Sequence, residues 1–136
     1  MIMQILVLYA ITAVIFLGLD AVGLSKIMRP LFETHISSML RDDVQIVAAT
    51  IFYLIYVAGL LYFVSVPALR GNAPMMALLN GAILGAIAYG TFEFTAFSVL
   101  KGWHWQMVAT DMVWGTVLTG FSAWAGVMLT RWIMPG

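Results

Sequence analysis

Three acidic side chains lie inside hydrophobic stretches of this sequence. Glu93 stands in the run NGAILGAIAYGTFEFTAFSVLKGW (80–103), Asp20 lies near the end of the N-terminal apolar run, and Asp111 lies near the start of the last one. An ionisable group in the middle of a membrane-spanning helix costs about 3 kcal/mol on insertion scales, so it usually faces protein or a cavity rather than lipid. Such acids can bind a polar group, carry protons or act as general acid and base.

The composition indicates an integral membrane protein. Of the 136 residues, 63% are hydrophobic and 9% are charged, whereas an ordinary soluble domain has about one-quarter charged residues. A spanning helix needs about 20 apolar residues, so four spans with short connections account for nearly the whole chain. We therefore expect one all-α membrane domain, residues 1–136, folded as a four-helix bundle.

The apolar runs and turn residues give the expected limits of the helices, which are 3–24, 46–69, 75–100 and 107–131. The N-terminal run lacks the basic region of a secretory signal, so we interpret it as a retained span. Between the first two spans, Pro30 is suited to a first helical position, and apolar residues recur on one face over 30–41. This pattern favours a short amphipathic helix at the membrane interface, and the alternative is a surface loop.

The predicted helices alternate in direction, which allows the depths of their polar residues to be compared. At 1.5 Å per residue, Asp20 and Asp111 lie about 6 Å, and Glu93 about 10 Å, from helix ends on the same side. Thr50 and Tyr53 lie at about 6 and 10 Å from that side on the second span. We therefore expect a polar cluster in one leaflet and an apolar half in the other.

Charge compensation for this cluster is not evident from the sequence, because Lys26, Arg41 and Lys101 fall at the predicted membrane edge. Either the lysines reach inward or some of the acids are protonated. The simpler alternative is that the polar groups only join the helices through hydrogen bonds. The candidate ligand-binding or proton-carrying side chains are Asp20, Thr50, Tyr53, Glu93, Thr95, His104, Asp111 and Trp114.

Small residues mark the predicted helix contacts. Gly81 and Gly85 have GxxxG spacing. Gly90 lies further along the same predicted helix, and Gly115 lies on the last predicted helix. Small residues let helix backbones approach closely in a membrane, where no hydrophobic effect drives association. We expect these glycines to pack helices within one chain, and a dimer contact is the alternative.

Metal and cofactor chemistry has little support in the sequence. The histidines, His35 and His104, flank the acid-bearing side, but no HExxH, Glu-x-x-His or i,i+4 histidine pair is present. There is no cysteine, phosphate-binding loop or nucleophile elbow. The six Lys and Arg are scattered, which argues against nucleic acid. We predict no metal and no cofactor. His104 stands between two tryptophans in the sequence, and we expect it to lie at the membrane interface.

Four segments together resemble a family of small bacterial membrane proteins, the domain of unknown function 2177. They are LGLDAVGL around Asp20, FYLIYVAGLLYFVSVPAL, AYGTFEFTAFSVLKGW, and DMVWGT, which holds Asp111, Trp114 and Gly115. The resemblance implies a four-span inner-membrane protein with no established reaction, so it transfers no catalytic role. This chain departs from the usual pattern with Glu93 in place of a common Asp and Ala96 in place of a common Asn.

The basic residues suggest an orientation. Lys26, Arg29, Arg41 and Lys101 lie on the acid-bearing side, against Arg70 and Arg131 opposite. The positive-inside rule then places the cluster in the cytoplasmic leaflet of a bacterial inner membrane and both termini in the periplasm.

Two functions fit these features. The first is a non-enzymatic bundle whose polar half binds a small amphipathic or lipid-like molecule, or docks a partner membrane subunit in a homo-oligomer or larger complex. The second is a proton-coupled transporter or lipid-directed enzyme that uses the same carboxylates. A hydrated path from the cluster to both surfaces would favour transport, whereas a pocket that opens sideways to lipid would favour a lipophilic ligand.

Overall fold

The computed structural model describes residues 1–41 and 45–135, and within these ranges the chain is helical with no strand. The helices in chain order are α1 (Ile2–Gly23), α2 (Arg29–Ile36), α3 (Ile46–Leu60), α4 (Val66–Arg70), α5 (Pro74–Val99) and α6 (Trp105–Ile133). Four helical runs in the described residues are long and apolar enough to cross a membrane, namely 2–39, 46–70, 74–99 and 105–133. The predicted all-α four-span fold is confirmed. Three of the predicted spans fall inside one of these runs, and the third, 75–100, extends one residue beyond the run 74–99.

Two of these helical runs contain a π-helical turn that ends two residues before a proline. The turn Leu24–Met28 joins α1 to α2, and the turn Leu61–Ser65 joins α3 to α4. Pro30 and Pro67 each occupy the second residue of the helix that follows. Because proline lacks an N–H and its ring crowds the carbonyl four residues earlier, the chain accommodates it by widening the preceding turn.

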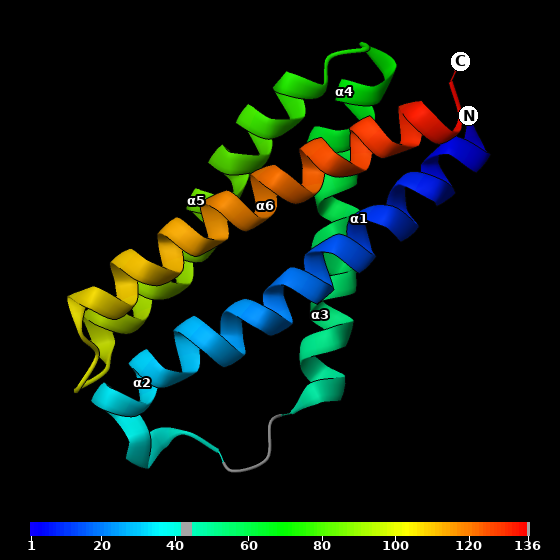
Figure 1. Cartoon of the computed structure of the whole chain (residues 1–136). Helices are drawn as coiled ribbons and strands as arrows, with labels where there is room; N and C mark the ends of the chain where they lie inside the picture. The colour runs from blue at the N-terminus through cyan, green and yellow to red at the C-terminus, as the bar shows by residue number, and fades with distance from the viewer. Residues whose placement is uncertain (42–44, 136) are drawn as a thin grey trace.

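The amphipathic helix predicted at 30–41 is present, but its limits differ from the prediction. It covers Arg29–Ile36, followed by a 3-10 turn at Ser37–Met39, and it continues α1 rather than standing alone (Figure 1). Phe32 contacts Trp103, and the His35 ring stacks on His104 with centroids 4.3 Å apart. α2 thus packs against the turn between α5 and α6.

Helices α5 and α6 form a close antiparallel hairpin through glycine contacts. A Cβ on Gly81 would lie 3.1 Å from the Cα of Gly120, and one on Gly85 would overlap the carbonyl oxygen of Gly115. A Cβ on Gly90 would lie 2.9 Å from Cε of Met112. The GxxxG residues therefore pack one helix against another within the same chain.

Helix α1 crosses the other side of α6, where Leu8 and Thr12 contact the backbone at Gly126. The chain ends are adjacent (Figure 1), and Gln4 Nε2 donates a hydrogen bond of 3.0 Å to the carbonyl oxygen of Met134. The apolar core lies in this half of the bundle and includes Phe16 and Val57.

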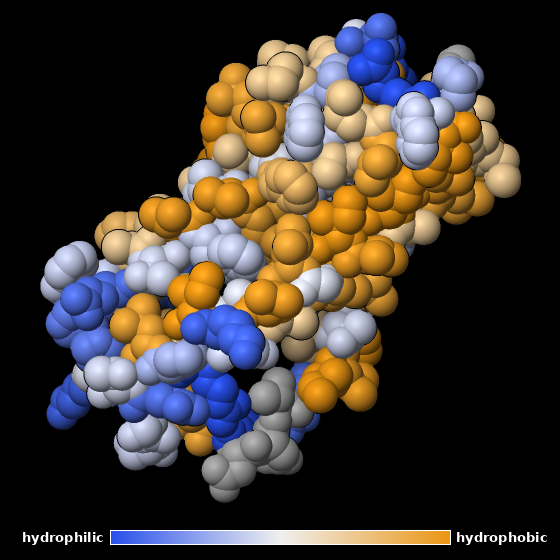
Figure 2. Space-filling view, in the orientation of Figure 1, coloured by the Kyte–Doolittle hydropathy of each residue, from blue (hydrophilic) through white to orange (hydrophobic). Residues whose placement is uncertain are grey.

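Helix α3 crosses the bundle at an angle, and its N-terminal half leans away from α5 and α6 (Figure 1). Its buried residues are Val57 and Leu60, both in the C-terminal half. Hydrophobic side chains cover the middle of the molecule, and hydrophilic ones gather towards its two ends (Figure 2). This distribution is the one expected of a protein whose middle faces lipid.

Candidate functional site

The three acids are all buried inside the helix bundle. The exposed fraction is 3% for Asp20 on α1, 0% for Glu93 on α5 and 8% for Asp111 on α6. They also interact with one another, because the Asp111 carboxyl lies against that of Glu93 and within electrostatic range of Asp20. Three different helices thus bring the acids to one level, and none of the three side chains faces lipid.

A residue in the turn that follows α5 holds the Glu93 side chain in place. Trp103 Nε1 donates a hydrogen bond of 3.0 Å to Glu93 Oε1, while Glu93 Oε2 has no hydrogen-bond partner among the described residues. Trp103 reaches this position because Gly102 adopts a φ of +84°, which lets the chain reverse sharply. Glu93 and Asp111 therefore form a carboxyl pair with one indole donor.

Asp20 lies among aromatic side chains from three other parts of the chain. Its carboxyl interacts with Tyr53 on α3 and with the Trp114 indole on α6, and it also faces Tyr89 on α5. The indole N–H of Trp114 and the hydroxyl of Tyr89 have no partner in hydrogen-bonding geometry among the described residues. The Asp20 surroundings thus contain polar groups with free hydrogen-bonding capacity.

A cavity of about 950 Å³ opens beside these residues, between the α1–α2 run, α3 and α5. Asp20, Asp111 and Tyr53 are part of its wall. Most of the remaining wall is apolar, and Phe52 and Phe92, 61% and 55% exposed, mark its edge on α3 and α5. The lean of α3 therefore leaves a hollow that opens sideways from the bundle and has carboxyl groups in its wall.

Aromatic rings surround the polar part of this cavity. Tyr53, Tyr56 and Tyr89 line it. Phe16 lies behind them, with ring centroids 5.6 Å from Tyr53 and 5.4 Å from Tyr56, and Tyr56 and Tyr89 are 6.4 Å apart. Tyr56 is held by a 3.0 Å hydrogen bond between its hydroxyl and that of Thr119 on α6. The tyrosines are thus fixed by packing against the core.

Comparison with known families places this arrangement in context. The model of the family described as "Predicted membrane protein (DUF2177)" matches residues 5–128. The chain belongs to this family. No curated protein and no solved structure matches it.

Three candidate residues from the sequence lie away from the acids. Thr95 is exposed, because two residues along a helix turn the side chain by about 200° from Glu93. Thr50 is half-buried on α3 and lies outside the cavity lining. His104 is the N-cap of α6, where its Nδ1 accepts a hydrogen bond of 3.1 Å from the Gln106 N–H. Thr95 therefore does not lie with the acids, and His104 caps α6.

Tyr89 and Trp103 were not selected from the sequence, although Trp103 hydrogen-bonds to Glu93 and Tyr89 lies within electrostatic range of Asp20. Tyr89 lies one helical turn before Glu93 on the same face, so helical spacing could have indicated it. Trp103 lies in the turn between α5 and α6. Its contact with Glu93 depends on the turn geometry at Gly102, which helical periodicity does not encode.

The opposite half of the bundle is less apolar than expected. Thr12, Ser65, Ser122 and Thr130 are each 0% exposed, and their hydroxyl oxygens have no hydrogen-bond partner among the described residues. Small hydroxyl side chains permit close helix contact much as glycine and alanine do, which explains their location at helix interfaces. The acids therefore lie in one half of the bundle, as predicted, but buried hydroxyl groups also occur in the half that was predicted to be apolar.

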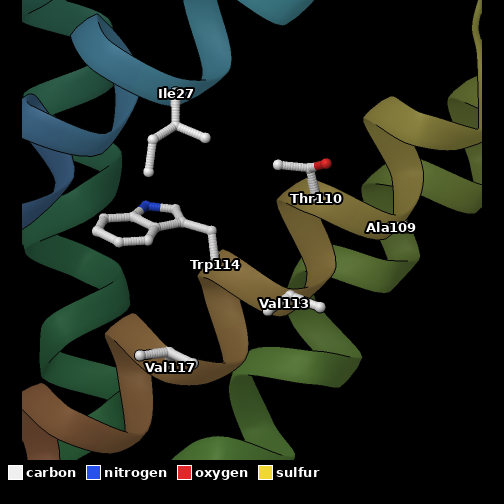
Figure 3. A pocket seen from close by; sticks show the side chains of 6 residues that line it. All are labelled: Ile27, Ala109, Thr110, Val113, Trp114 and Val117. Carbon is white, nitrogen blue, oxygen red and sulfur yellow. The ribbon is translucent and has the colours of Figure 1, made fainter.

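Trp114 separates the acids from a second hollow on the outer surface. Figure 3 shows its indole extending from α6 toward the helix that carries Ile27. A Cβ on Gly23 would overlap this indole, so the glycine makes room for it. The outer groove measures about 400 Å³ and is lined by Ile27, Ala109, Thr110, Val113, Trp114 and Val117. Its wall is apolar apart from Thr110 and the indole nitrogen, so it offers little polar chemistry.

The basic residues nearest the site do not extend into the acid cluster. Lys26 and Lys101 are exposed, and Arg29, at the outer end of the cavity, forms a 2.8 Å ion pair with Glu33. Among the described residues, no group of three or more His, Cys, Asp or Glu side chains is arranged to hold a metal ion. The sequence alternative in which the lysines reach inward is therefore not observed.

The Trp103 hydrogen bond leads to a stability prediction. Trp103→Phe keeps most of the ring packing but leaves Glu93 Oε1 without its donor, and a buried unsatisfied acceptor costs about 1–3 kcal/mol. We expect a lower unfolding temperature in detergent, measured by the loss of helical circular dichroism. Trp132→Phe is the control, because Trp132 is 80% exposed and should change stability by less than about 0.5 kcal/mol. Equal unfolding temperatures for both variants would contradict the assignment.

Proposed function

We propose that this chain is a non-enzymatic membrane protein that binds a small amphipathic, lipid-like molecule in the cavity between the α1–α2 run, α3 and α5. The observation that carries this proposal is the presence of Asp20 and Asp111, both more than nine-tenths buried, in the wall of a laterally open and mostly apolar hollow. In this proposal the polar end of the ligand contacts the acids and its apolar part lies along the helices.

The size and lining of the cavity support a small ligand. Its volume of about 950 Å³ lies within the range of about 300–1,000 Å³ common for small-molecule sites, which are also mainly apolar with a few polar groups. Asp20 and Arg29 both line it, and nine residues of helix separate them by about 13 Å.

The proposed setting is a bacterial inner membrane, with both termini in the periplasm. The end of α4, where Arg70 is the last residue, lies at the same end of the molecule as both termini, while the turn between α5 and α6, which holds Lys101, lies at the other end beside α2 (Figure 1). Lys26, Arg29 and Arg41 belong to that second side of the chain, so the positive-inside rule favours it as cytoplasmic. The ligand would then enter from the cytoplasmic leaflet.

Native mass spectrometry of the protein extracted in its own lipids tests the proposal. We expect a species one small molecule heavier than the chain, which survives delipidation better than the bulk lipid adducts. The same measurement reports a homo-oligomer or a partner subunit. A chain that carries only a graded distribution of bulk lipids, and that takes up no added amphiphile at a fixed stoichiometry, would contradict the proposal.

A second candidate function, proton transport, is favoured by the buried hydroxyls. Asp111, Thr119, Ser122 and Thr130 follow one face of α6 at spacings of eight, three and eight residues, and are all buried. They extend over about 28 Å, close to the thickness of the hydrocarbon core. Proton uptake into liposomes that contain the protein discriminates the two functions. A flux that Asp111→Asn abolishes would favour transport, whereas the binding proposal predicts none above empty liposomes.

A further inference from the structure

The charge and aromatic content of the cavity point to the chemical class of its ligand. Asp20 and Asp111 line the polar end, and Glu93 lies against Asp111 with its Oε2 atom unpaired among the described residues. Three carboxyl groups are thus concentrated within one small region. A buried carboxyl group either stays protonated or needs a compensating charge, so the acids in this region gain a partner when a positively charged group binds.

The nearest cation that lines the cavity is separated from the acids. Arg29 stands about 13 Å from Asp20 along the helix, and its Nε is engaged by Glu33 Oε1 at 2.8 Å. Arg29 therefore leaves the inner end of the cavity acidic. An anionic head group placed there would face like charge in a region of low dielectric, which is unfavourable.

The tyrosine rings add a second feature that favours a cation. Tyr53, Tyr56 and Tyr89 all line the cavity, and the ring packing described above keeps them around its polar end. Aromatic faces attract ammonium groups by about 0.5–2 kcal/mol, more strongly when water is excluded. Acids together with a group of aromatic rings form a typical environment for an organic amine or quaternary ammonium group.

We infer that the ligand is an amphipathic organic cation, whose ammonium group lies between Asp20, Asp111 and the tyrosine rings and whose apolar tail extends past Phe52 and Phe92 toward the lipid. This inference rests on the proposed binding function and specifies its head group. Lipid tails and the cavity wall are similarly apolar, so the tail contributes little selectivity. The head group therefore determines which amphiphile is retained.

Three probes with the same twelve-carbon tail test the inference on the intact chain in nanodiscs of neutral lipid. They are dodecyltrimethylammonium, dodecanol and dodecanoate, and native mass spectrometry measures the fraction of protein that binds each probe. We expect one cation per chain, with half-saturation at a mole fraction at least tenfold lower than for dodecanol or dodecanoate. Asp20→Asn and Asp111→Asn keep the side-chain shape but remove the charge. Each should weaken cation binding about tenfold or more, and by a larger factor than it weakens dodecanol binding.

The outcomes separate the inference from the function on which it rests. If dodecanol or dodecanoate binds as tightly as the cation at one site per chain, the cation inference is overturned and the binding function stands. If none of the probes binds to the wild-type chain at a fixed stoichiometry, both are overturned. The comparison of the probes on wild-type protein needs no variant, so a misfolded Asn variant cannot obscure the result.

Discussion

Replacement of Ala88 by tryptophan is expected to reduce amphiphile binding at least tenfold while the protein remains folded. Ala88 is a half-buried residue of α5 in the cavity wall, in the same helix as Tyr89. An indole at this position would occupy the hollow and keep the ligand head group from Asp20 and Asp111. Contacts of the ammonium group with aromatic faces are worth about 0.5–2 kcal/mol, and together with the lost attraction to the acids this corresponds to at least a tenfold loss of affinity.

The matched control is Ala10→Trp, because Ala10 is an exposed residue of α1 and its replacement adds the same side chain outside the cavity. Binding of dodecyltrimethylammonium in nanodiscs, measured by native mass spectrometry, should be unchanged in this control. If Ala88→Trp bound the probe as well as Ala10→Trp does, the ligand would have to lie elsewhere, and the outer groove beside Trp114 would become the site to examine.

Substitution of Gly85 by alanine is expected to cause a large loss of stability. A Cβ at this position would overlap the carbonyl oxygen of Gly115 and lie 2.8 Å from the Thr119 side chain. The first of these is a backbone atom, so α5 and α6 would have to separate, and overpacking of this kind costs about 1–3 kcal/mol. We expect unfolding at a lower temperature or a lower fraction of denaturing detergent than for the wild type.

Gly18→Ala is the control for this substitution, because a Cβ on Gly18 would meet no atom within 4 Å. Alanine is the better helix former by about 1 kcal/mol in a helix interior, so this variant should be as stable as the wild type or more stable. Equal destabilisation by both substitutions would indicate that the glycines matter for helix flexibility and not for the close α5–α6 contact.

The membrane spans were predictable because they depend on the length and polarity of single segments. Runs of about 20 apolar residues separated by turn residues define the four helices, and helix rise with alternating direction was enough to predict one level for Asp20, Glu93 and Asp111. The contacts of Gly81 and Gly85 with α6 also follow the expectation that such spacing packs helices of one chain.

The cavity was not predictable in the same way, because it depends on the angle between helices. The direction of α3 relative to α5 depends on side-chain packing in the C-terminal half of α3, where Val57 and Leu60 are buried. Hydropathy carries no information about this direction. The same limit applies to the Trp103 contact with Glu93, which requires a left-handed φ at Gly102. Sequence spacing thus gave the depth of the polar residues but not the space beside them.

Photolabelling with a diazirine-bearing dodecyl ammonium probe, mapped by peptide mass spectrometry, tests the central claim most directly. That claim is that the buried acids form the polar end of a ligand cavity between the α1–α2 run, α3 and α5. We predict saturable labelling of peptides that contain residues 20–32, 46–56 and 88–92, and its loss in Ala88→Trp. Labelling confined to the outer groove at Val113 and Val117, or spread evenly over the lipid-facing surface, would contradict the account.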